Sequence, residues 1–381
     1  MKAEKPKGPV ALAAEIKQEA QRLGFGLVGI SPVESPPHEV CFADWLRRGL
    51  GGELGYLKRT EHLRRDPRKL VPWASSVVSV GMNYYTPLPR TAQAGVKGWI
   101  SRYAWGDDYH DIMKKKVGSL LDAVRQVYPG PVKGRAFVDS GPVLERDLAR
   151  TAGIGWIGKN SHLISPHRGS WFFLGELFLS IELPYDRPVG DRCGRCNLCL
   201  KACPTGAFVG PYIVDARRCI SYITIELKGA IPRHLRRLMG SHVFGCDICQ
   251  EVCPYNVKAI PTGEEAFSPR RGLYGPELVP LLSLSAGEFR RRFRGSPILR
   301  AKRGGFLRNV AVALGNLRSR EAVPALARAL LDKERLVRQH AAWALGEIGS
   351  VAAGEALKGQ LDAESDPDVG EEIREALGKL Q

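Results

Sequence analysis

The sequence lacks an apolar run long enough to cross a membrane. Its 381 residues contain no uninterrupted stretch of about 18 apolar residues, the length that indicates a transmembrane helix. Residues 1–9 are rich in Lys and Pro, and residues 10–23 follow an amphipathic helical pattern, so nothing resembles a secretory signal. Cys41 is the single cysteine outside residues 193–254, and we expect it to be a buried structural thiol. These absences predict a cytoplasmic protein with reduced thiols and no membrane contact.

The balance of charges favours a polyanionic partner. The chain has 56 Lys and Arg against 40 Asp and Glu, a formal net charge of +16, and a pI of about 9.5. The rest of the composition, 44% hydrophobic and 25% charged, is ordinary for a globular protein of two or three domains. Such a positive surplus attracts nucleic acid, but a generally basic surface would give the same composition.

Eight of the nine cysteines lie between Cys193 and Cys253. They follow the pattern Cys-x2-Cys-x2-Cys-x3-Cys-Pro, then an isolated Cys219, then Cys-x2-Cys-x3-Cys-Pro. The first run is typical of bacterial ferredoxins with two [4Fe–4S] clusters, in which the fourth cysteine of a run binds the other cluster. That rule predicts two ligand sets: Cys193, Cys196, Cys199 and Cys253 for the first cluster, and Cys203, Cys219, Cys246 and Cys249 for the second.

Two other uses of these cysteines compete with the clusters. Zinc also binds four thiolates, and Cys-x2-Cys pairs are common at zinc sites. Disulfides are less suited, because the cysteines are concentrated in one segment of a long chain and do not stabilise a small secreted domain. The paired Cys-x3-Cys-Pro endings favour iron–sulfur clusters, and therefore electron transfer.

Predicted strands and helices alternate through the first 185 residues. Asp139 follows a predicted strand in the turn Asp-Ser-Gly-Pro, where a catalytic side chain is both fixed and accessible. A turn or a helix N-cap is the alternative role for this aspartate. We expect helices at 10–23, 42–50, 109–127 and 143–152, a short strand before residue 30, and strands at 77–81, 135–138 and 170–183, the last of which could be a strand pair.

A glycine-rich run, Gly-Ile-Gly-Trp-Ile-Gly-Lys-Asn, occupies residues 153–160. Three glycines in six residues would let the backbone approach a large ligand closely. The run is not a dinucleotide fingerprint, because no strand–helix–strand unit with an acidic residue about 20 positions later surrounds it. The sequence therefore does not predict NAD binding there.

The residues beyond Pro280 are typical of helical repeats. Ala-Leu-Gly recurs at 313–315, 344–346 and 376–378, and each copy closes a helical run. Spacings of 31 and 32 residues are typical of a HEAT-like α-solenoid, which binds proteins or nucleic acid along one face. A purely structural helical cap is the alternative. Basic residues that could contact phosphates, or form a solvated face, gather near the cysteines and the repeats: Arg233, Arg236, Arg237, Arg290, Arg291, Arg292, Arg294, Arg300, Lys302, Arg303 and Arg308.

Taken together, the motifs resemble the epoxyqueuosine reductase family. The resemblance rests on Val-Asp-Ser-Gly-Pro at 138–142, the run at 153–160, the double set of cysteines, and Cys-Ile-Ser-Tyr-Ile-Thr-Ile-Glu-Leu-Lys-Gly at 219–229. It covers almost the whole chain. It implies an oxidoreductase of tRNA processing that uses cobalamin, fed with electrons by the two clusters, to reduce epoxyqueuosine to queuosine at the wobble position. The partners implied are tRNA with a GUN anticodon carrying epoxyqueuosine and an external low-potential electron donor.

The resemblance also implies an α+β chain of three parts. Residues 1–185 would form a cobalamin-binding α/β domain similar to that of reductive dehalogenases. Residues 186–262 would form a ferredoxin-like domain with two [4Fe–4S] clusters, and residues 263–381 a linker with HEAT-like repeats. We expect the protein to be a monomer.

Site residues follow from matching positions. Asp139 would donate a proton to the epoxide oxygen, for which burial beside an uncharged cofactor face would have to raise its pKa. Residues 108–113 lack the glycine of the Asp-x-His-x-x-Gly signature, so we expect base-off cobalamin without a histidine ligand. For the apolar residues among the cobalamin contacts given next, packing in the core is the alternative role. The implied cobalamin contacts are Arg64, Ser101, Asp139, Ile157, Asn160, Leu163, Leu174, Ser221, Cys246 and Asp247. The implied RNA contacts are Lys228, Arg290, Arg291, Arg292 and Arg294.

Two other functions stay open. A corrinoid and iron–sulfur reductase of a small molecule would share the cofactors, but the basic surface and the helical repeats disfavour it. A non-enzymatic electron-transfer protein that docks through its solenoid would share the clusters, but it leaves Asp139 and the glycine-rich run unexplained.

Overall fold

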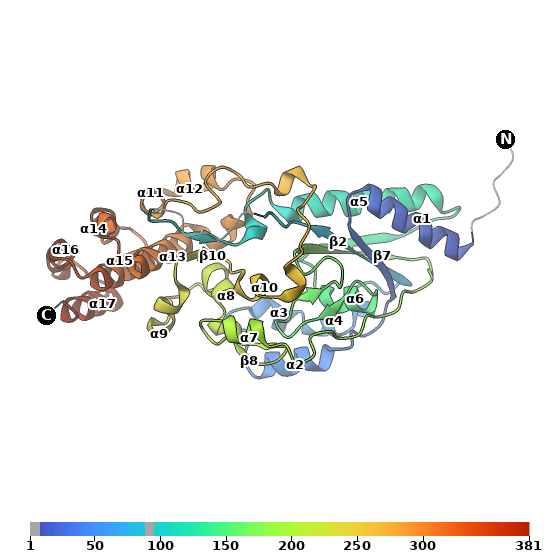
Figure 1. Ribbon diagram of the computed structural model, residues 1–381, viewed down its shortest axis with the longest axis horizontal. Helices are drawn as coiled ribbons and strands as arrows, with labels where there is room; N and C mark the ends of the chain where they lie inside the picture. Colours follow the sequence, from blue (N-terminus) through green and yellow to red (C-terminus); the bar gives the residue numbers. More distant parts are fainter. Residues whose placement is uncertain (1–7, 88–94, 381) are drawn as a thin grey trace.

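The computed structural model describes residues 8–87 and 95–380 of an elongated molecule. A sheet with its helices forms one end, the helical repeats form the other, and the cysteine-rich segment lies between them (Figure 1). Among the residues that the structure describes, every helix is too short or too polar to traverse a lipid bilayer.

The main sheet has four strands in the order β1-β2-β7-β4, and every pairing is antiparallel. The central strand β2 is rich in valine and almost entirely buried, because both faces of the sheet are covered. The predicted strands at 77–81, 135–138 and 170–183 are confirmed, the last as a single strand. The bounds are β1 (Leu27–Pro32), β2 (Ser76–Asn83), β4 (Gly134–Phe137) and β7 (Phe172–Leu179).

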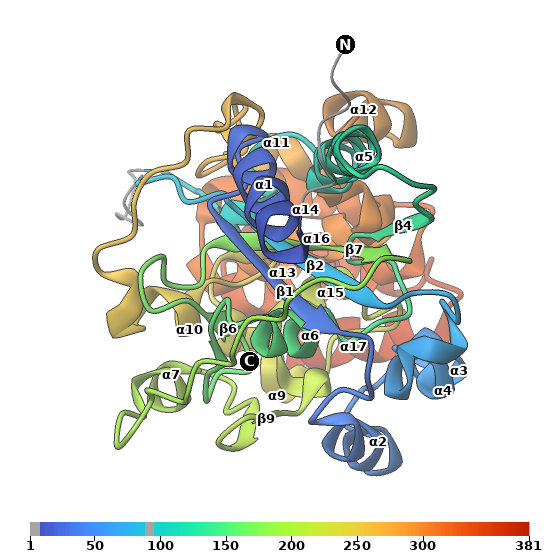
Figure 2. The same cartoon turned by 90° about the vertical axis from the view of Figure 1, so that its right-hand side faces the viewer.

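Helices cover the two faces of this sheet, with α1 (Pro9–Arg22) and α5 (Tyr109–Val127) on one side and α6 (Glu145–Thr151) on the other (Figure 2). The first face holds a core that includes Ile16 and Val117. On the second face α6 lies so close to β1 that a Cβ on Gly29 would be 1.9 Å from the carbonyl oxygen of Ala152. This close approach fixes α6, and with it the turn that precedes it.

Short elements complete this part of the chain. Cys41 lies in α2 and is exposed, so the expected buried structural thiol is wrong. An amphipathic helix that covers little of the core leaves its cysteine in solvent. The bounds are α2 (Glu39–Arg47), α3 (Gly55–Arg59), α4 (Glu61–Arg65), β5 (Trp156–Ile157) and β6 (Leu163–Ile164).

A parallel pairing between distant segments joins the sheet region to the cysteine-rich segment. Strand β10 (His242–Phe244) pairs with β3 (Trp99–Ile100), and the amide of Ser101 donates to the carbonyl oxygen of Phe244 at 2.8 Å. The division of the chain at residues 185 and 262 stays a prediction, and this pairing crosses the first of these limits. The other elements of the segment are α7 (Leu198–Ala202), β8 (Phe208–Gly210), β9 (Ile213–Val214), α8 (Ile220–Ile225), α9 (Arg233–Arg236) and α10 (Ile248–Glu251).

Close helix crossings explain the repeated Ala-Leu-Gly motif. A Cβ on Gly315 would lie 2.7 Å from the ring of Trp343, and one on Gly346 would lie 2.8 Å from the Cβ of Ala376. Glycine therefore recurs in the first two copies where the next helix passes, whereas a Cβ on Gly378, in the last helix, would meet nothing within 4 Å. The helices beyond residue 277 are α11 (Leu278–Leu282), α12 (Ala286–Arg292), α13 (Lys302–Leu317), α14 (Val323–Ala329), α15 (Arg335–Ile348), α16 (Val351–Leu361) and α17 (Pro367–Gly378).

Several of the basic residues expected to contact phosphates are internal. Arg308 is 1% exposed and donates to the carbonyl oxygens of Ile223, Leu227 and Gly229, which anchors the end of α8 to α13. Arg236 is also buried, and it forms an ion pair with Glu372 of α17 at 2.9 Å. For these two residues the phosphate-binding expectation is wrong, because they tie the cysteine-rich segment to the solenoid.

Candidate functional site

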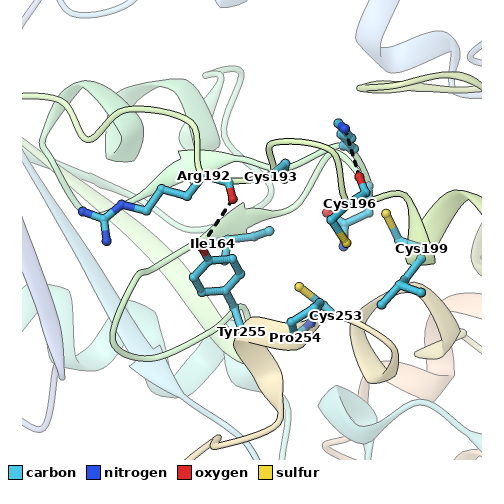
Figure 3. Close-up of a pocket in the computed structure, with 11 residues that line it drawn as sticks. Ile164, Arg192, Cys193, Cys196, Cys199, Cys253, Pro254 and Tyr255 are labelled. Atoms are coloured by element: carbon cyan, nitrogen blue, oxygen red, sulfur yellow. Dashed lines mark hydrogen bonds between the residues drawn. The ribbon is translucent and has the colours of Figure 1, made fainter.

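The cysteines of the predicted first cluster line one cavity together with Lys159 and Tyr255. Figure 3 shows the sulfur atoms of Cys196, Cys199 and Cys253 facing the same space. The Nζ of Lys159 donates to the carbonyl oxygens of Gly194 and Cys196 at 2.6 and 2.9 Å, which fixes the loop that carries the cysteines. The structure thus brings together the side chains that the crossing rule assigns to the first cluster: Cys193, Cys196, Cys199 and Cys253.

The other three cysteines of the predicted second cluster gather around Cys249. Burial, followed by the nearby sulfurs of Cys246, Cys219, Cys199 and Cys203, raises the pKa of Cys249 well above its ordinary value. Because Cys199 belongs to the first group, the two groups are neighbours. The Nε2 of His162 lies 3.7 Å from the sulfur of Cys249.

The thiols are free and widely spaced. All nine cysteines are unbridged, so the disulfide alternative is wrong. Within residues 8–87 and 95–380, no three His, Cys, Asp or Glu side chains are close enough to hold a single metal ion. Ligands of a [4Fe–4S] cube stand around a group larger than one ion, so spacing alone does not exclude clusters at these positions.

The glycine-rich run lies at the junction of the two cysteine groups. Lys159 contacts the first group, and the Nδ2 of Asn160 donates to the carbonyl oxygen of Cys249 at 3.3 Å. Its glycines are needed for internal packing, because a Cβ on Gly155 would be 2.1 Å from the carbonyl oxygen of Ile164. The run therefore forms the tight β5–β6 hairpin, and the close approach it permits is to the protein's own backbone.

Asp139 lies in the turn after β4 in a strained conformation. Its φ of +52° is in the left-handed region, which residues other than glycine rarely adopt. Its Oδ2 accepts hydrogen bonds from the hydroxyl of Tyr109 at 2.9 Å and from the Nε2 of His110 at 3.0 Å. The Nδ1 of His110 in turn contacts the Oδ1 of Asp108 at 2.7 Å. The first turn of α5 thus presents an Asp–His–Asp chain to the β4 turn.

The charged and hydrogen-bonding partners of Asp139 oppose the raised pKa that we expected for its carboxyl group. Burial alone would raise that pKa, but the hydrogen bonds from His110 and Tyr109 and the charges of His110 and Arg300 outweigh it, so the pKa is lowered. Burial disfavours the charged form of His110, but its bonds to Asp108 and Asp139 raise its pKa to about 9. The raised pKa was expected beside a cofactor face and stays a prediction, whereas here the Asp139 side chain is 59% exposed and faces an imidazolium.

A second acidic group lies behind the turn. The backbone N–H of Asp139 donates to the Oε1 of Glu145 at 2.5 Å, and Glu145 faces the buried Glu176 of β7. Asp139 is therefore held through its side chain by α5 and through its backbone by α6.

The predicted cobalamin contacts fall into three places. Arg64 is buried near Asp139 and donates to the carbonyl oxygen of Val143 at 2.8 Å. Ser101 donates to the Oδ1 of Asp247 at 2.5 Å, and burial raises the pKa of Asp247 to about 6. The apolar positions lie in one small apolar cluster that contains Ile157, Leu163 and Leu174. Leu163 is buried there, and the other two are half-buried.

The predicted RNA contacts lie on the surface near the same turn. Arg290, Arg291, Arg292 and Arg294 are exposed, and the amide of Asp108 donates to the carbonyl oxygen of Gly295 at 2.9 Å. This bond places the basic segment beside the start of α5. Lys228 is exposed as well, and its amide donates to the Oε2 of Glu53 at 2.8 Å. Arg300 lies between these positions and pairs with Glu226 through two contacts of 3.0 Å.

Comparisons with known proteins agree along the chain. A family model described as "Epoxyqueuosine reductase QueG, DUF1730" matches residues 64–140, a 4Fe-4S double cluster binding domain matches residues 192–256, and HEAT repeats match residues 298–378. The epoxyqueuosine reductase of Pseudomonas aeruginosa is 48% identical over 352 residues, which are 90% of this chain and 96% of the relative. The chain belongs to the epoxyqueuosine reductase family.

Solved structures of epoxyqueuosine reductases have the same fold. A crystal structure with an epoxyqueuosine-modified tRNA-Tyr stem loop matches with a TM-score of 0.88 and 31% identity, covering 97% of this chain and 99% of that one. A Bacillus subtilis structure, whose aspartate-bearing catalytic loop is swung out of the active site, matches with a TM-score of 0.90 and 30% identity over the same shares. This chain is accordingly an oxidoreductase with a double [4Fe–4S] domain and HEAT repeats, and not a zinc protein.

Sequence reasoning missed the side chains that hold Asp139. Tyr109 and His110 lie about 30 residues before Asp139, and no local pattern connects the two segments. Glu176 is hidden in an apolar strand. Glu145 could have been found, because it stands six residues after Asp139 in the first turn of the next helix, where a carboxylate often receives a backbone N–H.

Proposed function

We propose that this chain reduces epoxyqueuosine to queuosine at the wobble position of tRNA with a GUN anticodon, with Asp139 as the proton donor. The reaction consumes two electrons and two protons and releases water. The observation that carries the proposal is the hydrogen-bonded Asp139, held beside exposed arginines in a chain that also has a double-cluster domain. The crystal structure of a relative with the same fold, bound to an epoxyqueuosine-modified tRNA stem loop, supports the substrate.

His110 and Asp139 together hold the proton. With the pKa of Asp139 lowered and that of His110 raised to about 9, the proton resides on the imidazolium at neutral pH. The two groups titrate as a pair, so Asp139 can pass this proton to the epoxide oxygen while the carbon–oxygen bond breaks. Tyr109 orients the carboxylate, and Asp108 stabilises the imidazolium.

Cobalamin is the cofactor that we assign to this site. When bound, it would take up single electrons and deliver them to carbon. Its fit rests on the half-buried positions, which keep surface for a ligand: Ile157, Leu174, Ser221 and Cys246. The side chains of Ser101, Asn160 and Asp247 are buried and bonded within the protein, so we assign them the role of shaping the site.

Electrons enter at the first cysteine group. Cys196 is exposed and Leu198 keeps 49% of its surface, whereas Asp247, next to Cys246 of the second group, is buried. The exposed side chains of Arg192, Arg195 and Lys201 surround the first group, so the external low-potential donor is one with an acidic surface. A single copy of the chain contains every group named, and we propose that a monomer acts in the cytoplasm.

RNA phosphates would bind the basic segment next to α5. Arg290, Arg291, Arg292 and Arg294 are exposed there, and so is Lys228, two residues after the Glu226 that pairs with Arg300. Charge-assisted contacts to phosphates position a nucleic acid without reading its bases.

The deciding experiment is an assay on an anticodon stem loop that carries epoxyqueuosine, with iron-loaded protein, cobalamin and a chemical reductant. Conversion to queuosine that needs both cobalamin and reductant is expected. Absence of conversion by protein with both clusters and bound cobalamin would overturn the proposal. The alternatives of a small-molecule reductase and of a plain electron carrier gain no support from the basic segment or from Asp139.

A further inference from the structure

The β5–β6 hairpin carries two side-chain nitrogens that reach cysteine sulfurs. The Nε1–H of Trp156, in β5, donates to the sulfur of Cys193 at 3.5 Å. The Nε2 of His162, directly before β6, lies 3.7 Å from the sulfur of Cys249. Because Cys193 belongs to the first cysteine group and Cys249 to the second, one short hairpin contacts both groups.

The turn of the hairpin fixes the position of His162. The amide of Gly158 donates to the carbonyl oxygen of His162 at 2.8 Å, and the amide of His162 donates to the Oδ1 of Asn160 at 3.2 Å. The Nδ2 of Asn160 donates in turn to the carbonyl oxygen of Cys249 at 3.3 Å. Two side chains of this turn therefore contact the same cysteine, Asn160 at its backbone and His162 at its sulfur.

The chemistry of a cluster ligand decides the direction of the His162 contact. A free thiol can donate its proton, whereas a cysteine bound to iron is a thiolate and can only accept a hydrogen bond. The ring nitrogen that faces this sulfur must then carry the hydrogen, so the Nε2–H of His162 donates to Cys249. In the predicted ligand sets the cysteines supply all four ligands of each cluster, and His162 is not needed to bind iron.

Solvent acts unequally on the two cysteine groups. Cys196 of the first group is exposed, whereas each of the four cysteines of the second group is half-buried. Reduction adds one negative charge to a cluster, and both water and hydrogen bonds to sulfur stabilise that charge and raise the reduction potential. Exposure by itself thus makes the first cluster the easier one to reduce, and an electron taken up there would pass inward against a potential difference.

We propose that His162 and Trp156 tune the reduction potentials of the two clusters separately, and that the Nε2–H of His162 raises the potential of the second cluster so that electrons pass inward. His162 acts through the sulfur of Cys249 and is a positioning residue of electron transfer. Trp156 acts through Cys193 and keeps the first cluster reducible by the external donor. The glycine-rich run serves this purpose, because its close backbone packing builds the hairpin that carries both donors.

The catalytic meaning of this tuning rests on the proposed function, but both potentials can be measured without substrate. A redox titration of the full-length protein with both clusters in place, followed by electron paramagnetic resonance, provides them. His162→Leu removes the N–H donor, whereas His162→Gln keeps an amide N–H in the place of Nε2. His167→Leu changes an exposed histidine three residues after β6 and is the control, which should titrate like the wild type.

His162→Leu should lower one of the two potentials and leave the iron content per chain unchanged. The expected loss is about threefold to tenfold in the equilibrium constant for reduction, the size of a weak to ordinary hydrogen bond. For one electron this corresponds to about 28–59 mV. His162→Gln should restore most of the loss, because the N–H is present again. A side chain that only filled space would not give this difference between Leu and Gln.

Trp156→Phe tests whether the two clusters are tuned separately. It removes the N–H that Cys193 accepts, but it keeps an aromatic ring against Tyr255, whose ring centroid lies 4.7 Å from that of Trp156. The potential that His162→Leu leaves in place should fall in this variant, and the other should stay. The two clusters are neighbours, so a small shift of both values is expected from their interaction, with the larger shift on a different cluster in each variant.

Three results would overturn the tuning. One is a His162→Leu protein with unchanged potentials, and another is the same potential falling most in both His162→Leu and Trp156→Phe. The third is loss of iron in both His162→Leu and His162→Gln, because His162 would then be an iron ligand. Shifted potentials in a protein that never reduces epoxyqueuosine would retain the tuning and refute the proposed function. Conversion of epoxyqueuosine with unshifted potentials would do the reverse.

Discussion

Asp139 shows how a residue can be both exposed and closely controlled. Two hydrogen bonds, from Tyr109 and His110, fix a side chain that remains 59% exposed, and a third, from the backbone N–H of Asp139 to Glu145, holds the backbone. A substrate can therefore reach the carboxylate without any opening of the core. The left-handed backbone is the local strain that these contacts maintain.

Replacement of Asp139 by Asn should remove the proton donor and leave the surroundings in place. We expect kcat on the modified stem loop to fall by about 10²–10⁴-fold, the usual contribution of a positioned acid. Iron and cobalamin content should equal those of the wild type. The neighbouring Ser140→Ala is the control. Loss of cofactor in Asp139→Asn would instead make the aspartate structural.

Replacement of His110 by Gln should remove a charged pair that stabilises the fold over a limited pH range. The raised pKa of His110 means that its contribution is complete below about pH 6.5 and is lost as pH rises through about 9. The lowered pKa of Asp139 means that its contribution is lost in acid. Thermal unfolding should show a loss of at most about 1 kcal/mol at neutral pH, because the pair is exposed. The two proteins should converge above about pH 9; a constant difference would contradict the pairing.

At the scale of elements, the repeat glycines are explained by helix crossings. A Cβ on Gly315 would meet the ring of Trp343 and the backbone of Ala344 at 2.7 and 2.9 Å, whereas one on Gly359 in α16 would meet nothing within 4 Å. The same residue type thus has opposite roles in two helices of the solenoid.

Gly315→Ala and its control Gly359→Ala should therefore change stability in opposite directions. Overpacking at the α13–α15 crossing should cost about 1–3 kcal/mol. The second variant should gain up to about 1 kcal/mol from the better helix propensity of alanine. Chemical unfolding of each variant measures both. Equal effects would mean that the crossing can relax.

The basic segment around α12 should act as one unit in RNA binding. Changing Arg290, Arg291, Arg292 and Arg294 to Gln should weaken stem-loop binding and lower the salt slope by about 0.7–0.9 per lost phosphate contact. Arg320→Gln with Arg328→Gln, exposed in the solenoid, is the control. Binding titrations at several salt concentrations provide the slopes. An unchanged slope would place the RNA elsewhere.

Local patterns predicted most elements, and contacts between distant segments account for what was missed. Helical periodicity located α1, α5 and α15, and cysteine spacing gave the two ligand groups that gather in space. No pattern could pair β3 with β10, which are about 140 residues apart, because a two-residue strand has no periodicity. The contacts of Tyr109 and His110 to Asp139 could not be foreseen either, because they join segments about 30 residues apart that no local pattern connects. These contacts lower the pKa of Asp139, whereas the sequence prediction considered only burial beside a cofactor.

Across the whole molecule, the two cysteine groups differ in the charge and in the burial of the residues around them. The first cysteine group is at the surface among Arg192, Arg195 and Lys201, and the second is next to the buried Asp247. Under the proposed function, reduction from outside therefore starts at the first group.

Reversal of this charge should slow reduction by an acidic protein donor. Arg192→Glu, Arg195→Glu and Lys201→Glu together should lower the second-order rate about tenfold or more and weaken donor binding, with a loss of salt dependence. Reduction by dithionite should stay unchanged, because a small reductant needs no docking surface. The same reversal at Arg318, Arg320 and Arg328 is the control. A tenfold loss with dithionite as well would indicate damaged clusters.

One continuous apolar core connects regions that lie far apart in the sequence. It includes Trp105 before the cysteines, Phe244 between them and Trp343 in the solenoid. Such a core makes unfolding cooperative, so damage at one end is transmitted to the other. Chelation of iron should therefore lower the melting temperature of the helical repeats together with that of the cysteine-rich segment, in a single transition. A chain that lacks its clusters would then be less stable throughout and more easily degraded by proteases, so that chains without cofactors would be removed.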